Sequence, residues 1–389
     1  MRITEVEIHE FDYELEDVGT WKNRQAYDPG STLEPPGFVL TIRTADGTEG
    51  HYRGFYFVPA MLAQVRMAAG VLIGRDPLER EELWQDLWKR FRHLDHAGVG
   101  PIDVALWDLA GRHFDAPVYA LLGGTPDPVP AYASTFMADE EEDGLNSPEA
   151  YADYAERCLE DGYPGFKIHG FGDPDDDVAI CRAIHERVGG EMDLMIDPAS
   201  EYDTYAETLR VGRVCDDLDF YWYEDPMADG GESIEMNRNL ARDLDTPILG
   251  VEHVRGGPYG RVDHLANDAL DMVRAEAHLD CGITGVMKIA SIVEGFGRDV
   301  ELHVGGPAHL HCMTAIRNTN YYEHALLHPQ GIDWMVDQGF VDSPEQVNSD
   351  GHVEIPDGPG LGVEIDWDFV ERRGTGHELF DREASSGLP

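Results

Sequence analysis

Five segments between residues 165 and 276 repeat one pattern, in which a short apolar run ends in an ionisable residue. They are GFKIHG (165–170), DLMIDP (193–198), FYWYEDP (220–226), PILGVEH (247–253) and LDMVRAE (270–276). Apolar runs of this length are typical of strands buried on both faces of a parallel sheet. The pattern continues on both sides, in VPAYAST (129–135), DVELHVG (299–305) and NYYEHAL (320–326).

Helical stretches separate these strands, among them SPEAYADYAERCLEDG (147–162) and ITGVMKIASIVEGFG (283–297). Eight strands that alternate with helices predict an α/β fold of the (β/α)₈ barrel type. A doubly wound sheet is the structural alternative. That fold usually has fewer units and a glycine-rich nucleotide turn, and no GxGxxG follows the first strand here.

The chain before the barrel has a different composition. Residues 1–58 alternate like strands, with an Asp46-Gly47 turn that suits a hairpin, and LEREELWQDLWKRFRHL (78–94) has helical periodicity. We therefore predict an α+β module at residues 1–126 and a barrel at residues 127–335. A C-terminal segment at residues 336–389, with the short strands HVEIP and LGVEIDW, is expected to pack back on the first module.

The charge balance is strongly acidic, with 76 Asp and Glu against 29 Lys and Arg and a net charge of −47. Nucleic acid and anionic membrane surfaces are excluded as partners, because both need a cationic surface. Only four of the cations are lysines, and this composition resembles proteins of halophiles that live with molar salt. At that salt the Debye length is only ~3 Å, so self-repulsion is screened.

The sequence indicates a cytoplasmic protein. It begins without an apolar signal region, and it has no apolar run of about 18 residues that could span a membrane. Its five cysteines are an odd number without a CxxC pair, so we expect them to be reduced and mostly buried.

Three carboxylates are predicted to meet at one end of the barrel. Asp197, Glu224 and Glu252 follow neighbouring strands at spacings of 27 and 28 residues. Barrel enzymes carry their chemistry at this end, and three convergent carboxylates need a compensating cation. Hard oxygen ligands favour Mg²⁺, with Mn²⁺ as the second choice. The alternative is that these carboxylates pair with arginines.

These segments resemble the enolase superfamily, in its mandelate racemase/muconate lactonizing enzyme branch. The resemblance covers nearly the whole chain, because AGVGPIDVALWDLAGRHFDAPVYALLGG (97–124) looks like the capping-domain helix of that branch. It implies a modified TIM barrel with an N-terminal α+β capping domain. It also implies Mg²⁺ on the three carboxylates and removal of the proton α to a substrate carboxylate, through an enediolate.

The resemblance further implies a base on each face of the substrate. The branch usually ends its second barrel strand with Lys-x-Lys, and here Lys167-Ile168-His169 makes His169 the base and Lys167 its cationic neighbour. His303 matches the second base, and Glu276 stands where the family has the Asp that orients it. A zinc site made of His303, His309 and His311 is the alternative for the histidines, and the break Gly305-Gly306-Pro307 argues against it.

Further contacts to the substrate are expected from Glu323 and from the capping domain. Glu323 is expected to end the eighth strand, and the resemblance implies that it binds the substrate carboxylate as a protonated acid, since nearby anions would raise the pKa of its carboxyl. Its alternative is a salt bridge to an arginine such as Arg317. Two capping-domain segments add possible contacts to hydroxyls or a distal anion, from Trp21, Arg24, Tyr52 and Arg53.

The leading functional hypothesis is a hydro-lyase that dehydrates an acid sugar, an aldonate or aldarate, to a 2-keto-3-deoxy acid. A racemase or epimerase of a 2-hydroxy acid and a cycloisomerase of sugar lactones are the alternatives, and a catalytically silent ligand-binding relative is a remote one. The partner is thus a small-molecule carboxylate, and the resemblance implies a homo-oligomer.

Overall fold

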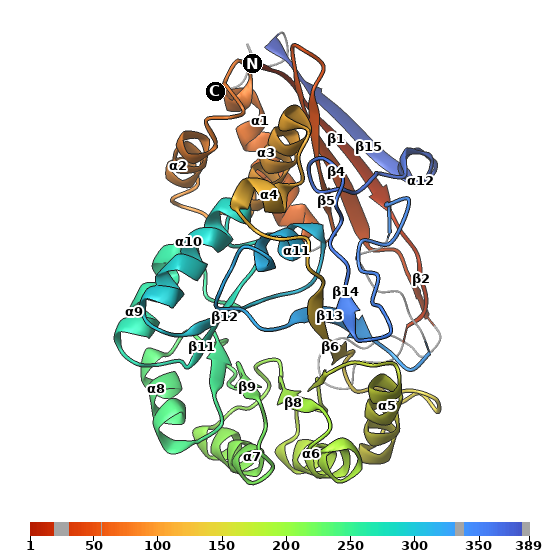
Figure 1. The fold of residues 1–389 in the computed structure, drawn as a ribbon, viewed down its shortest axis with the longest axis vertical. Coiled ribbons are helices and arrows are strands. Elements are labelled where there is room, and N and C mark those ends of the chain that lie inside the picture. The colour runs from red at the N-terminus through yellow and green to blue at the C-terminus, as the bar shows by residue number, and fades with distance from the viewer. Residues whose placement is uncertain (19–30, 56, 331–337, 383–389) are drawn as a thin grey trace.

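The computed structural model describes residues 1–18, 31–55, 57–330 and 338–382 (Figure 1). The N-terminal part builds an antiparallel sheet in the order β15-β1-β4-β5, and a small ribbon of β2 and β3 extends from it. Its strands are β1 (Ile3–Asp12), β2 (Leu15–Val18), β3 (Ser31–Leu33), β4 (Pro36–Thr44), β5 (Glu49–Gly54) and β15 (Gly374–Phe380).

Helices cover one face of this sheet, which we call the cap sheet. Val6, Ile8 and Leu40 alternate along the strands onto that face, where they are fully buried with apolar residues of the helices. The opposite face carries Phe11 and Val39, which pack against the C-terminal helix α12. The helices of the cap, on both faces together, are α1 (Val58–Leu72), α2 (Arg80–Arg90), α3 (Val99–Phe114), α4 (Val118–Leu122) and α12 (Trp367–Arg372).

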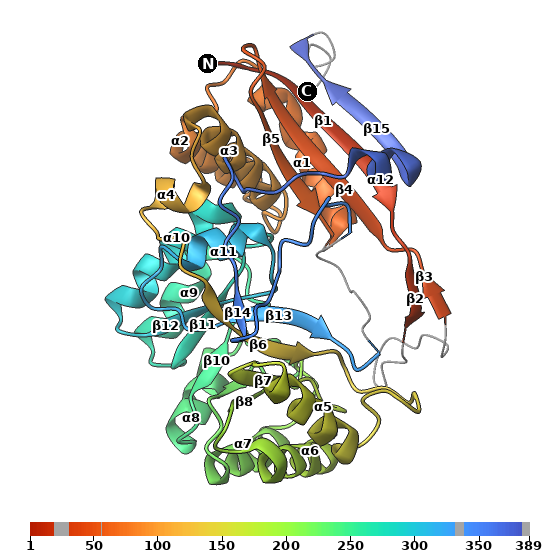
Figure 2. The ribbon, with the colours of Figure 1, turned by 45° about the vertical axis from the view of Figure 1, so that its right-hand side comes forward.

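The barrel follows the cap in the chain and lies beside it in space (Figure 2). Its parallel strands are hydrogen-bonded in the order β12-β11-β10-β9-β8-β7-β6-β13, with β14 (His352–Val353) antiparallel to β6. The strands are β6 (Val129–Thr135), β7 (Gly165–Ile168), β8 (Asp193–Ile196), β9 (Trp222–Glu224), β10 (Ile248–Gly250), β11 (Met272–Ala275), β12 (Asp299–Leu302) and β13 (Tyr322–Leu327).

Amphipathic helices alternate with these strands and surround them (Figure 1). The helices are α5 (Pro148–Glu160), α6 (Pro174–Val188), α7 (Tyr205–Asp217), α8 (Ile234–Asp243), α9 (Gly257–Ala266), α10 (Gly282–Gly295) and α11 (Pro307–Met313). The predicted α/β barrel of the TIM type with an α+β cap is confirmed. The domain limits at residues 126 and 335 stay predictions.

The cap docks on the barrel through α3. At Gly100 a Cβ atom would collide with the carbonyl oxygens of Ala277 and His278, so only glycine permits this close approach. One turn later, the buried Asp103 accepts hydrogen bonds from the Thr284 backbone N–H at 2.8 Å and from its hydroxyl at 2.6 Å, at the start of α10. The cap therefore rests directly on the loop that follows β11.

The C-terminal segment contacts both parts, and it contacts the barrel through the pairing of β14 with β6. Asp108 of α3 accepts hydrogen bonds from the backbone N–H groups of His51 and Leu361, both at 2.8 Å, and β15 completes the cap sheet beside β1. All five cysteines are buried and free, as expected. None of the helices in the described part of the chain is both long and apolar enough to cross a lipid bilayer.

The buried side chain of Glu301 bridges β12 and the start of β13. It accepts hydrogen bonds from the backbone N–H of Asn320 at 3.1 Å, from the Asn320 amide at 2.7 Å and from the backbone N–H of Tyr321 at 3.2 Å. Burial nevertheless raises the pKa of Glu301 to about 7, and these hydrogen bonds offset the effect only in part.

This raised pKa of Glu301 predicts that the free energy of unfolding depends on pH. Between the unfolded pKa near 4.5 and the folded pKa near 7, the folded state binds more protons, so its stability falls as the pH rises. We expect the wild type to lose stability relative to Glu301→Gln over this interval. Urea unfolding at several pH values measures the difference, and a difference that stays constant with pH would contradict the assignment.

Candidate active site

Asp197, Glu224 and Glu252 converge at the carboxyl ends of β8, β9 and β10. Their side-chain oxygens lie within 4.8 Å of one another. Asp197 and Glu224 are buried, and Glu252 is partly buried. The strands pair in parallel, which brings the three loops to the same end of the barrel. An all-oxygen donor set in this arrangement fits a hard divalent cation such as Mg²⁺.

Two buried cations lie beside these carboxylates. The Nζ atom of Lys167 is 3.1 Å from Glu224 and 3.4 Å from Asp197. Arg274 of β11 binds both oxygens of Glu224, with its Nη2 at 2.8 Å from Oε2. Burial alone would lower the pKa of Lys167, but the charges of Glu224 and Glu323 outweigh it and raise the pKa well above its usual value.

Arg274 was not among the predicted site residues. It is fully buried, and it also donates to the hydroxyl of Tyr132 at 2.8 Å and to the carbonyl oxygen of Leu302 at 3.1 Å. Glu224 is therefore paired with an arginine, and it also keeps a ligand atom within the group of three carboxylates. The signal was present in the sequence, because a charged residue inside the apolar run of β11 needs a buried partner.

His169 lies directly after β7 and faces Asp197. Its Nδ1 is 2.7 Å from the carbonyl oxygen of Thr135, and its Nε2 is 3.1 Å from an oxygen of Asp197. A carbonyl oxygen only accepts, so Nδ1 carries a proton. The nitrogen that can exchange a proton with a substrate is therefore Nε2, beside the three carboxylates.

His303 lies on the other side of the three carboxylates, directly after β12. Its Nδ1 is 3.2 Å from Glu276 and its Nε2 is 3.1 Å from Glu252. Burial would lower the pKa of His303, but the charges of Glu252, Glu276 and Glu323 raise it to about 9. The glutamate at position 276 therefore reaches the imidazole of His303.

Buried polar contacts fix the loops that carry Glu252 and Glu276. Asp225 accepts hydrogen bonds from the backbone N–H groups of Val251 at 3.0 Å and Glu252 at 2.8 Å. Asp280 likewise accepts from the backbone N–H of Glu276 at 3.1 Å and pairs with Arg261 at 2.7 Å. These contacts position the backbone of the two loops that carry the predicted site residues Glu252 and Glu276.

The loop that carries His303 is held by His309. The Nδ1 of His309 donates to the carbonyl oxygen of Gly305, and its Nε2 accepts from the backbone N–H of Ala277 at 2.8 Å. The Nδ1 of His311 accepts a hydrogen bond from the backbone N–H of Tyr119 at 3.1 Å, and Tyr119 belongs to α4 of the cap rather than to this loop. The zinc alternative for the histidines is therefore wrong, because His309 and His311 serve backbone groups.

Two parts of the prediction for Glu323 are wrong, its place at the end of the strand and its raised pKa, while its contact with the substrate carboxylate stays a prediction. Glu323 is the second residue of β13 rather than its last, and it is an ionised partner of Lys167 rather than a protonated acid. Burial raises the pKa of a carboxyl, but Lys167 at 2.8 Å, Arg274 and His303 outweigh it and hold the pKa well below its usual range. Arg317 pairs with Glu294 at 2.9 Å instead.

The predicted substrate contacts from the cap have different outcomes. Trp21 and Arg24 lie outside the described residues. Tyr52 is buried, and its hydroxyl lies 2.8 Å from Nδ1 of His278, a residue of the loop after β11. Arg53 is also buried and lies over the rings of Phe55, Tyr13 and Phe11. Tyr52 therefore links the cap to the barrel loop that begins at Glu276.

Comparisons with known proteins agree with this fold and site. Residues 150–369 match the family described as enolase C-terminal domain-like, and residues 30–123 match the mandelate racemase/muconate lactonizing enzyme N-terminal domain. The chain therefore belongs to the mandelate racemase/muconate lactonizing enzyme family of the enolase superfamily.

Individual relatives span almost the whole chain. An arabinonate dehydratase of Saccharolobus solfataricus is 30% identical, with 86% of this chain and 90% of that protein covered. A D-galactarolactone cycloisomerase of Agrobacterium fabrum is 29% identical, with coverage of 95% and 98%. A solved structure of D-glucarate dehydratase from Agrobacterium tumefaciens, complexed with magnesium, has 33% identity and a TM-score of 0.84, and covers 97% of this chain and 100% of that one.

The three carboxylates predict a specific loss of metal binding. Asp197→Asn and Glu252→Gln should each weaken Mg²⁺ binding by at least about tenfold, because each removes a charged ligand from the group. Glu276→Gln is the matched control, since Glu276 faces His303 from outside the group. Calorimetric titration with Mg²⁺ measures the affinities, and an equal loss in the control would contradict the ligand assignment.

Removal of the Arg274 guanidinium is predicted to lower the free energy of unfolding strongly. Arg274→Met leaves the buried Glu224 without its two-pronged partner, which should cost about 3–5 kcal/mol. Arg298→Met is the control, because Arg298 is one-third exposed and pairs with Asp271 near the surface, where a loss of about 1 kcal/mol or less is expected. Urea unfolding without Mg²⁺ compares the two variants, and similar losses would contradict the role given to Arg274.

Proposed function

We propose that this chain is a Mg²⁺-dependent acid-sugar dehydratase, a hydro-lyase acting on an aldonate or aldarate. The observation that carries the proposal is the placement of two histidines on opposite sides of three convergent carboxylates. His169 contacts Asp197, and His303 contacts Glu252. Dehydration needs one group that removes a proton and another that protonates the leaving hydroxyl, and this arrangement supplies both.

Asp197, Glu224 and Glu252 would hold Mg²⁺. When bound, the ion supplies the positive charge that stabilises the negative charge developing on the substrate carboxylate. The magnesium complex of D-glucarate dehydratase, which shares this fold at 33% identity, supports the choice of metal. The ammonium of Lys167 adds a fixed positive charge beside the same group.

The hydrogen-bond partners of the two histidines suggest different roles for them. The Nδ1 proton of His169 is held by the carbonyl oxygen of Thr135, so Nε2 is the ring nitrogen that would take a proton from the substrate, and we assign His169 as the base. Nδ1 of His303 faces the carboxylate of Glu276, which stabilises the protonated ring and makes it the acid. Glu323 acts as a positioning residue that holds Lys167.

The elimination then proceeds through two proton transfers. His169 takes the proton from the carbon next to the carboxylate, and the electron pair of the broken C–H bond forms a carbon–carbon double bond. His303 gives its proton to the hydroxyl on the following carbon, which leaves as water. The enol that remains tautomerises to a 2-keto-3-deoxy acid, so the sum of the reaction is loss of one water molecule.

A cycloisomerase of sugar lactones is the second candidate. It is favoured by the D-galactarolactone cycloisomerase relative, whose match covers 95% of this chain. Both candidates begin with the same proton removal and differ in the step after it. We also expect a homo-oligomer that works in the cytoplasm at high salt; its acidic composition supports the high-salt part of that expectation.

A substrate panel tests the proposed function. Aldonates and aldarates are incubated with the protein and Mg²⁺ in molar KCl, and semicarbazide detects the 2-keto acid. We expect at least one acid to respond, and the response to disappear in Glu224→Gln and on chelation of the metal. A panel without any keto acid, with sugar lactones converted instead, would overturn dehydration in favour of the cycloisomerase.

The assigned roles predict that variants of the two histidines lose different steps of the reaction. His169→Asn should lose both dehydration and exchange of the α-proton with D₂O, because it lacks the base. His303→Asn should lose dehydration by about 10²-fold or more but keep the exchange, because only the acid is missing. Proton NMR of the responding acid follows both processes, and the reverse pattern would exchange the two roles.

A further inference from the structure

A second cluster of metal-binding side chains lies on the cap sheet, outside the barrel. Glu7 and His9 belong to β1, and His377 belongs to the C-terminal strand β15. His9 pairs with His377 in the ladder between these strands, so both rings project from the same face, and Glu7 reaches that face two residues earlier. The face is the one opposite α1, since Val6 and Ile8 point into the core.

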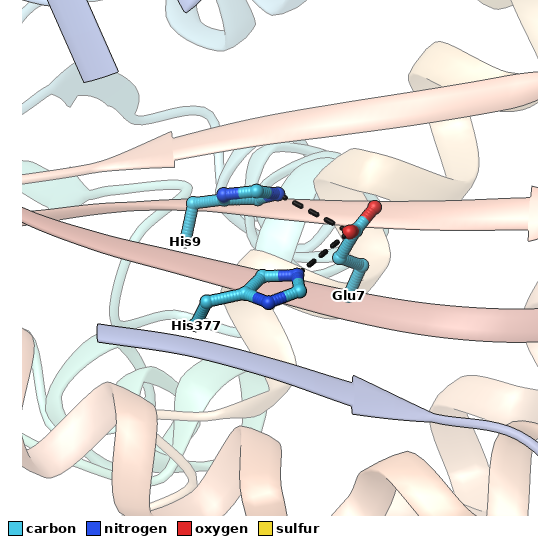
Figure 3. A group of neighbouring side chains, drawn as sticks. All are labelled: Glu7, His9 and His377. Carbon is cyan, nitrogen blue, oxygen red and sulfur yellow. Dashed lines mark hydrogen bonds and ion pairs between the residues drawn. The ribbon is translucent and has the colours of Figure 1, made fainter. Parts of the chain in front are cut away.

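The three side chains point at one another (Figure 3). Nε2 of His377 is 2.8 Å and Nε2 of His9 is 3.3 Å from the same oxygen of Glu7, and the two ring centroids are 4.5 Å apart. Each residue offers a ligand atom within 4.8 Å of the others. A tetrahedral ion about 2.1 Å from each ligand needs ligand atoms about 3.4 Å apart, so entry of the ion requires only a small opening.

Neighbouring side chains hold the cluster in place. Arg43 of β4 donates to Oε2 of Glu7 at 3.3 Å, which leaves Oε1 directed at the two histidines. Arg43 also pairs with Glu5 and with Glu49, so three carboxylates surround one guanidinium. The ring of His9 packs edge-on against Trp367 at 5.2 Å. The surroundings are thus net negative and orient the ligands, as the outer contacts of metal sites do.

We propose that Glu7, His9 and His377 form a binding site for a divalent transition-metal ion, with Zn²⁺ as the best fit. Two imidazoles and a carboxylate suit Zn²⁺, Ni²⁺ or Cu²⁺ far better than Mg²⁺, which distinguishes the site from the all-oxygen group in the barrel. His377 is about half exposed, with its side chain 53% accessible, so the fourth ligand position is open to water.

The position of the site gives the ion a structural consequence. β15 is an edge strand of the cap sheet, and its ladder with β1 ties residues near the two ends of the chain together. An ion bound by side chains of both strands binds the folded sheet and not the separated strands, so it stabilises the docking of β15. The bound ion thus cross-links β1 and β15, and it takes no part in the reaction in the barrel.

Co²⁺ titration of the full chain tests this site. The barrel group is first saturated with excess Mg²⁺, and Co²⁺ is then added as a coloured substitute for Zn²⁺. We expect about one equivalent of Co²⁺ to bind with visible bands of tetrahedral type, to be displaced by Zn²⁺, and to raise the melting temperature. Binding should weaken by at least about tenfold in His377→Gln and in His9→Gln, since each removes one of three protein ligands.

Two controls identify where the ion binds. His93→Gln removes an exposed histidine of the cap outside the cluster, and Glu252→Gln removes a carboxylate of the barrel group. Both variants should keep the cobalt bands. Bands lost in Glu252→Gln but kept in His377→Gln would place the ion in the barrel, and weak binding unchanged by either cluster variant would reduce the cluster to a hydrogen-bonded surface group. Either result would overturn the proposal.

Discussion

The ion pairs of Lys167 and Arg274 with the buried carboxylates are the constraint on which the barrel interior depends. Glu224 and Glu323 are fully buried, and both lie beside these two cations. Removing either cation would leave a charge in a site that cannot solvate it. Asp197 and Glu252 add further negative charge. The balance of charges at the mouth of the barrel therefore permits a divalent cation to bind there.

The residues proposed for the reaction lie mostly on loops, and buried polar contacts give these loops their geometry. Asp225 fixes the backbone at Glu252, Asp280 fixes the backbone at Glu276, and His309 joins the loops after β11 and β12. The cap adds Tyr52, whose hydroxyl contacts His278 of the same region. A site held in this way is preorganised before substrate arrives, as proton transfer between fixed groups requires.

The sequence was sufficient for the barrel and for the convergence of its strand-end residues, because the strand–helix repeat and the parallel topology follow from local pattern. The sequence did not predict the ionisation of Glu323, because that depends on Lys167 and Arg274, which lie beside it only in the folded barrel. Arg274 itself could have been found as a charge in a buried strand. The cluster on the cap sheet could not, because His377 meets Glu7 and His9 only through a pairing between the two ends of the chain.

The fate of the α-hydrogen and the mass of the product distinguish dehydration from isomerisation. An acid that responds to the Mg²⁺-loaded protein is converted in D₂O, and the product is analysed by NMR and mass spectrometry. Dehydration predicts a product lighter by one water molecule, without the hydrogen at the carbon next to the carboxylate and with solvent deuterium on the following carbon. A product of unchanged composition with deuterium on the first of these carbons would contradict dehydration and identify an isomerase.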